Sequence, residues 1–155
     1  MSEPQQQPTF GIEKIYVKDL SLEIPHAPGI FLSGDQPQVE VQLHHEHAAI
    51  GEGLHQVVLT VTVTAKAAEK TLFLVEAAQA GIFQIRNVPE SDLEPLLATA
   101  CPNILFPYVR ETVSDVIVRA GFPPVHLAPV NFEALYLQRR QQAQEQAAPK
   151  IEIAH

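Results

Sequence analysis

The first half of the chain alternates between apolar and polar residues, a pattern that predicts β-strands with one buried face. Four such segments are present: IYVKDLSLEI (15–24), VEVQLH (39–44), VVLTVTVTA (57–65) and TLFLVEAAQAGIFQI (71–85). The apolar phase of the first segment switches around Lys18, which predicts a bulge or a bend there. The short segment KAAEK between the third and fourth strands predicts a tight turn.

The fourth strand departs from clean alternation, because residues 72–75 form an almost continuous apolar run. A strand that is apolar on both sides is expected to be covered on both sides. In a four-stranded sheet the second cover comes from the helices of the same domain or from another subunit. This run is therefore a first indication of oligomerisation.

The second half carries helical patterns. PESDLEPLLATA (89–100) predicts a short helix with early acidic residues, and Pro102 is expected to end it. Asn103 is expected to cap a second helix that runs to about Ala120 and ends at Gly121. The apolar stripe of that helix consists of Leu105, Val109, Val113, Val116, Ile117 and Ala120. Asn131 is expected to cap a last helix, whose apolar side holds Phe132, Leu135 and Tyr136.

Strands followed by helices, without βαβ alternation, predict an α+β fold with an antiparallel sheet and C-terminal helices packed on it. The length of 155 residues suits one domain. We expect a disordered N-terminal tail (1–9), a single domain (10–140) and a mobile C-terminal tail (141–155), since both ends are rich in polar Gln.

The segment GFPPVHLAPVNF (121–132) combines prolines with apolar side chains. The prolines exclude regular structure, yet Phe122, Val125, Leu127, Val130 and Phe132 are apolar, whereas loops are usually polar. Prolines hold such a segment outside helix and strand at low entropic cost, so that its side chains stay presented. This pattern favours binding through apolar burial.

Composition excludes several function classes. The formal net charge is -8, which disfavours nucleic acid and anionic membrane surfaces as partners. The N-terminus lacks the pattern of a signal peptide, and no apolar run approaches the roughly 20 residues of a membrane span. A single cysteine, Cys101, points to a reducing compartment and is interpreted as a buried core residue. We therefore expect a cytoplasmic protein.

No catalytic constellation is apparent. The segment LHHEHAAIGEGLH supplies His44, His45, His47 and His55, but this polar, glycine-containing stretch is interpreted as a solvated loop and not as a metal site. Phosphate-binding glycine motifs and a G-x-S-x-G nucleophile motif are absent. We expect no enzymatic activity, no cofactor and no bound metal.

The segment CPNILFPYVRETVSDVIVRAGFPPVHLAPVNFEALY (101–136) resembles the signature stretch of the SecB family of bacterial protein-export chaperones. IYVKDLSLEIPHAP (15–28) resembles the first strand of that family, and LTVTVTA and GIFQI resemble its third and fourth strands. The resemblance covers roughly residues 10–137, and NILFPY and LAPVNFEALY are its most specific parts.

The resemblance implies a homotetramer, built as a dimer of dimers, in which long helices lie between sheets. It also implies an ATP-independent chaperone that holds unfolded preproteins in apolar grooves and delivers them to the SecA motor, without inserting into the membrane. Implied groove residues are Val39, Val41, Leu43, Phe122, Val125, Leu127, Phe132, Leu135 and Tyr136. Implied SecA-binding residues are Asp19, Glu23, Leu74 and Glu76. Implied tetramer contacts are Val75, Ala77, Gln79, Val109 and Val113.

Two alternatives stay open at this point. One is a stand-alone chaperone of the same fold that serves a single partner, such as a toxin or an antitoxin. The full acidic SecA-binding set argues against it. The other is a metal-dependent enzyme that uses His44, His45, His47 and His55.

Overall fold

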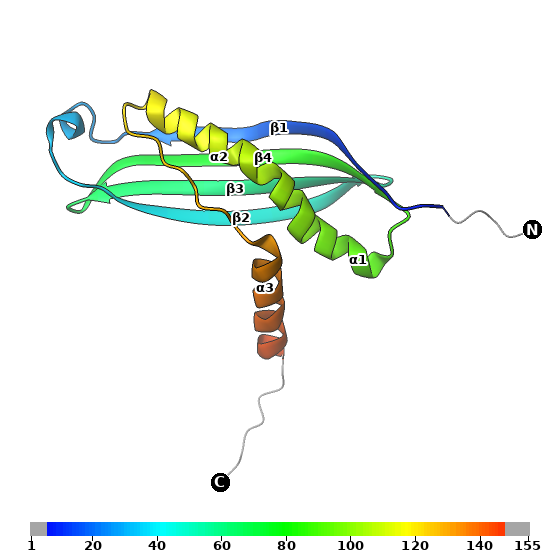
Figure 1. Ribbon diagram of the computed structural model, residues 1–155. Helices are drawn as coiled ribbons and strands as arrows, with labels where there is room; N and C mark the ends of the chain where they lie inside the picture. Colours follow the sequence, from blue (N-terminus) through cyan, green and yellow to red (C-terminus); the bar gives the residue numbers. More distant parts are fainter. Residues whose placement is uncertain (1–5, 148–155) are drawn as a thin grey trace, which may run out of the picture.

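The structure, a computed structural model, describes residues 6–147 and consists of two layers. Its four strands are β1 (Thr9–Glu23), β2 (Gln38–Gly51), β3 (Leu54–Ala67) and β4 (Lys70–Arg86). All pairings are antiparallel, and the strand order is β1-β4-β3-β2 (Figure 1). The helix α2 (Cys101–Arg119) lies against one face of this sheet, whereas α3 (Phe132–Ala147) projects beyond β2, and the order of strands followed by helices confirms the predicted α+β fold.

The strand register assigns each side chain to one of two faces. Val63 lies opposite Val75 on β4 and opposite Val41 on β2, and all three face the helices. We call this the helix-side face, and the other the open face. Because side chains alternate along a strand, the predicted row Val57, Leu59, Val61 and Val63 lies on the helix-side face, where each side chain is 0% exposed.

The edge strand β1 contains the predicted irregularity. Its register with β4 shifts between Val17 and Asp19, and again between Ile12 and Lys14. Each shift keeps an apolar side chain on the helix-side face although the sequence phase changes. The switch around Lys18 therefore marks a real bulge.

The histidine-containing segment is not a loop, so that prediction was wrong. β2 continues through it to Gly51, and His45 and His47 pair with Leu59 and Val57 of β3. Backbone pairing with a strongly strand-forming partner overrides the polar composition of this segment. The turn to β3 follows at Glu52 and Gly53.

The helical region was predicted with the wrong boundaries. α1 (Glu90–Pro95), a π-helical turn (Leu96–Ala100) and α2 (Cys101–Arg119) follow one another without a break, so Pro102 does not end a helix and Asn103 does not cap one. The Cys101 N–H donates to the Leu96 carbonyl, five residues back. This wider turn precedes Pro102, which has no N–H to donate, and lets the chain continue as helix.

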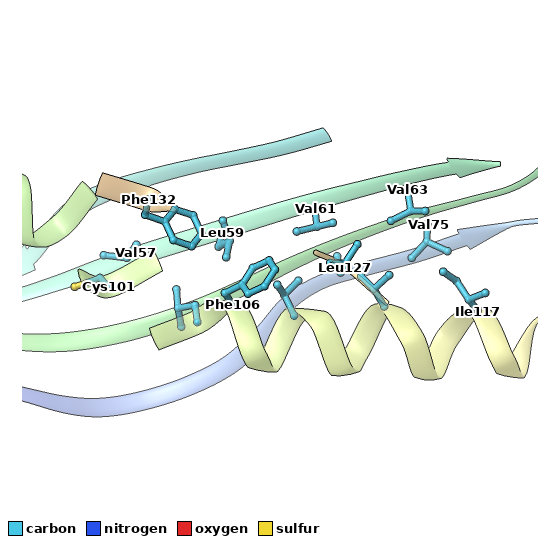
Figure 2. Packing of buried hydrophobic residues seen from close by; sticks show 14 of the residues in the cluster. Val57, Leu59, Val61, Val63, Val75, Cys101, Phe106, Ile117, Leu127 and Phe132 are labelled. Atoms are coloured by element: carbon cyan, nitrogen blue, oxygen red, sulfur yellow. The ribbon is translucent and has the colours of Figure 1, made fainter. Parts of the chain in front are cut away.

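α2 packs on the sheet through a straight apolar row. Leu105, Val109, Val113 and Ile117 recur every four residues and are all fully buried, as the stripe predicted. Figure 2 shows side chains of this cluster between α2 and the strands. At Gly81 of β4, a Cβ would lie only 3.0 Å from Leu105 Cδ2, so glycine permits the close approach of the helix.

Gly121 ends α2 with φ +94, and the Phe122 N–H donates to the Ile117 carbonyl at 3.2 Å, as expected of a helix C-terminus. The loop then crosses the helix-side face to α3 (Phe132–Ala147) (Figure 1). Asn131 caps α3 as predicted, because its Oδ1 accepts from the Ala134 N–H at 3.0 Å.

The described elements extend beyond the predicted domain limits of residues 10 and 140. β1 begins at Thr9, and α3 extends to Ala147, beyond the predicted limit at residue 140. Residues 1–5 and 148–155, which make up much of the two predicted tails, lie outside the described part of the chain. The expected disorder of the tails therefore stays a prediction.

Candidate functional site

Apolar side chains of β2 lie exposed on the helix-side face. Val39 and Val41 are 44% and 46% exposed, although they lie in the same cross-strand rows as the fully buried Ala65 and Val63. Leu43 is half-buried and packs against the core. The sheet thus extends beyond its own helical cover, and the uncovered strip is apolar.

The proline-containing loop divides its apolar residues between two roles. Leu127 and Phe132 are buried at 6% and 3% exposure, so they anchor the loop and the start of α3 to the core. Phe122 and Val125 are only half-buried. Of the predicted groove residues in this segment, these two retain surface that a bound chain could cover.

One part of this surface was not predicted from the sequence. The segment between β1 and β2 forms a 3-10 turn, η1 (Gly29–Leu32), in which Phe31 is 47% and Leu32 is 90% exposed. The Phe31 ring lies 5.2 Å from the Phe122 ring, centroid to centroid. The sequence carries a signal for this segment, because the apolar residues of GIFL lie between prolines. The same combination of prolines and apolar side chains identified the loop at 121–132.

Two clefts flank the start of α3. One, of about 540 Å³, lies between the helical region and the loop and includes Val130 and Phe132. The other, of about 760 Å³, includes Tyr136 and lies between β2, α1 and α3. The first is lined by Thr99, Ala100, Asn103, Pro129, Val130, Asn131, Phe132 and Glu133. Neither cleft includes Val39, Val41 or Leu43, so these three predicted groove residues form a surface strip on β2 outside the two clefts.

The four residues of the predicted acidic set share the open face. The register pairs Glu23 with Leu74, Ser21 with Glu76, and Asp19 with Ala78. Asp19, Glu23 and Glu76 are exposed, and Leu74 is half-buried among them. The fold therefore gathers one apolar and three acidic side chains from two adjacent strands into one patch.

The predicted tetramer contacts lie inside the protomer. Val75, Ala77, Gln79, Val109 and Val113 are at most 3% exposed. They occupy the interface between β4 and α2, and Gln79 Nε2 donates to the Tyr16 carbonyl at 3.2 Å. Their side chains are thus covered by the chain itself, so in this arrangement they do not offer a surface to a second copy.

Exposed apolar side chains instead line the edge strand β1. Its helix-side face presents Phe10, Ile12, Val17, Leu20 and Leu22, each between 37% and 51% exposed. The outer edge of β1 also carries backbone groups that no strand within residues 6–147 pairs. An edge of this length with an apolar row is a surface that proteins ordinarily cover.

The remaining candidates for chemistry are the histidines and Cys101. Within residues 6–147, no group of three or more His, Cys, Asp or Glu side chains is placed to hold a metal ion. Burial lowers the pKa of His55, and the neighbouring His47 lowers it further. Cys101 is fully buried, and burial raises the pKa of its thiol to about 12, so the thiol stays protonated at neutral pH.

None of the helices between residues 6 and 147 is both long enough and apolar enough to cross a bilayer.

Comparison with known proteins places this fold in a family. The sequence model described as "Preprotein translocase subunit SecB" matches residues 3–143. The "Protein-export protein SecB" of Dechloromonas aromatica is 64% identical over 151 residues, which cover 97% of each chain. That of Chromobacterium violaceum is 64% identical over 146 residues, or 94% of this chain and 97% of the relative.

A solved structure shows the same fold at low identity. It is a SecB-like chaperone of Mycobacterium tuberculosis in complex with a peptide from the HigA1 antitoxin. The TM-score is 0.65 at 18% identity, over 78% of this chain and 90% of that chain. With a family match over most of its length and relatives at 64% identity, the chain belongs to the SecB family.

Proposed function

We propose that the protein is an ATP-independent chaperone of the cytoplasm that holds preproteins unfolded and delivers them to SecA for export. The observation that carries the proposal is the uncovered apolar strip on β2, at Val39 and Val41, in a chain of the SecB family. A folded domain that keeps such side chains exposed lowers its free energy when an unfolded chain covers them.

Binding by this strip needs no sequence motif in the client. Covering one valine side chain contributes at most about 1.5 kcal/mol, so each contact is weak. The proposed contacts lie on separate elements: the strip on β2, the half-buried Phe122 and Val125 on the loop, and Leu135 and Tyr136 on α3. A long client that reaches several of them gains affinity through effective concentration, and more so on an oligomer.

Release requires no chemistry on this chain. A client that folds buries the same side chains internally, and a client taken over by SecA leaves because the partner binds it in turn. We propose that the patch of Asp19, Glu23, Leu74 and Glu76 receives a basic segment of SecA. Its position on the open face supports this role, because that face lies on the opposite side of the sheet from the client strip.

We further propose that the protein is a homotetramer, arranged as a dimer of dimers. The exposed apolar row of β1, and its outer edge, which no other described strand pairs, support an assembly through that strand. The buried residues of β4 and α2 pack against each other within the protomer. In this proposal they affect assembly only indirectly, by holding α2 on the sheet.

The test measures native mass by light scattering, with and without a reduced, unfolded preprotein, at low ionic strength and without nucleotide. We expect a tetramer that takes up the unfolded preprotein and does not bind the same protein once folded. A monomer that ignores the unfolded chain would overturn the proposal.

A further inference from the structure

A side-chain contact between His45 of β2 and Arg139 of α3 joins the outer part of α3 to the sheet. Arg139 Nη1 lies 3.2 Å from His45 Nε2. A guanidinium has only donors, so Nε2 must accept, and the ring must carry its proton on Nδ1. The contact is therefore available only to neutral His45.

The surroundings of the ring disfavour the charged form. His45 Nδ1 is buried and has no hydrogen-bond partner within the described residues. Protonation would place a second N–H at Nε2, directed at the donor Arg139, and bring two cations together. Burial lowers the pKa of His45, and the charges of Arg139, His44 and His47 lower it further.

Other charged groups share the same cleft, and none of them replaces the contact. Glu46 neighbours His45 on β2, Glu90 and Glu94 line the cleft from α1, and Arg140 lines it from α3. None of these carboxylates makes a salt bridge with His45 or Arg139 in the part of the chain that the structure describes. The groups whose charge lowers the pKa of His45 are Arg139, His44 and His47.

The outer part of α3 has little else to hold it. The start of the helix is fixed by the buried Phe132 and by the Asn131 cap. From Leu137 to Ala147 every residue is exposed. A polar stretch of this length is marginal as an isolated helix in water, so its helicity depends on contacts such as that of Arg139.

We propose that His45 is a pH-dependent latch for α3, which holds residues 137–147 against the cleft when neutral and releases them when protonated. The docked state lowers the pKa of His45 below 6.5, so docking is favoured above pH 6.5 and is lost as the pH falls from 6.5 through the lowered value. The latch is a property of this chain whether or not α3 contacts clients.

Hydrogen–deuterium exchange of the full-length protein tests the latch. Protection factors are measured at about pH 7.5 and about pH 5.5, each relative to the intrinsic exchange at that pH. We expect the amides of residues 140–147 to lose protection at the lower pH, while those of residues 105–117 stay protected. Unchanged protection of residues 140–147 in the wild type would overturn the proposal without any variant.

Two substitutions assign the effect to one ring. In His45→Gln the amide oxygen can accept from Arg139 at any pH, so protection of residues 140–147 should not change between the two pH values. His44→Gln is the matched control, because it removes a histidine on the open face and keeps His45; it should lose protection as the wild type does. The same loss in His45→Gln as in the wild type would contradict a latch at His45.

Discussion

The ring of Phe122 packs against that of Phe73, with 4.8 Å between their centroids, and thereby ties the proline-containing loop to β4. Phe73 is buried, whereas Phe122 is half-buried and also contacts Phe31 of η1. The three rings join the connection between β1 and β2, the loop after α2 and the sheet. An apolar loop on the surface is therefore partly an anchor and partly a contact surface.

Replacing Phe122 by Ala should lower the free energy of unfolding by about 2 kcal/mol, because it removes one half-buried ring and its two aromatic neighbours. Urea unfolding followed by circular dichroism measures the change. Phe31→Ala is the control, since that ring is 47% exposed and its loss should cost less than that of Phe122. Equal losses would mean that the loop is not anchored through Phe73.

Val41→Asp should weaken the holding of unfolded clients by about tenfold, because a charge placed in the apolar strip must be desolvated when a client covers it. Val41 is a better site than Leu43, which packs against the core and would also affect folding. Suppression of client aggregation is the measurement. Gln42→Asp introduces the same charge on the next residue of β2, which faces the open side, and should leave suppression unchanged.

Glu76→Lys should abolish binding to SecA and leave client binding intact, because it reverses one charge of the open-face patch. Surface-immobilised SecA and an unfolded preprotein provide the two readings. Glu52→Lys is the control, because it makes the same charge change in the turn between β2 and β3. Glu52 lies next to Arg86, at the end of β4 that is away from Glu76. If Glu76→Lys retained SecA binding, the patch would not be the docking site.

Val17→Lys should lower the native mass, because it places a charge in the exposed apolar row of β1 that is proposed to meet another subunit. Light scattering at several protein concentrations gives the mass. Ser21→Lys adds a charge to the open face of the same strand and serves as the control. A tetramer that is equally stable in both variants would place the subunit contact elsewhere.

Cys101 should react with a thiol reagent only after the protein unfolds. Its side chain is fully buried, and burial raises the pKa of the thiol from 9.0 to about 12. Because the folded state holds the thiol protonated, its contribution to stability is present below pH 9 and is lost as the pH rises toward 12. Labelling with and without urea at pH 7 to 8 checks this, and rapid labelling of the native protein would contradict the buried position.

Much of this architecture follows from the sequence alone. The two-residue period of a strand, seen in Val57 to Val63, assigns each residue to one face. The same period in the first strand puts Asp19 and Glu23 on one face before any strand pairing is known. The four-residue spacing from Leu105 to Ile117 likewise defined the buried side of α2. Such local periods suffice because a side chain's direction is fixed by its neighbours in the chain.

Tertiary structure decided what local rules leave open. The segment with His44 to His47 is a strand because β3 pairs with it, and Pro102 lies within a continuous helical run because a π-turn precedes it. The exposure of a side chain likewise depends on which other elements pack over it. Val41 and Val63 belong to one cross-strand row, yet α2 covers only the second. The cover of a side chain depends on elements distant in sequence, and therefore no local pattern distinguishes the core from the binding strip.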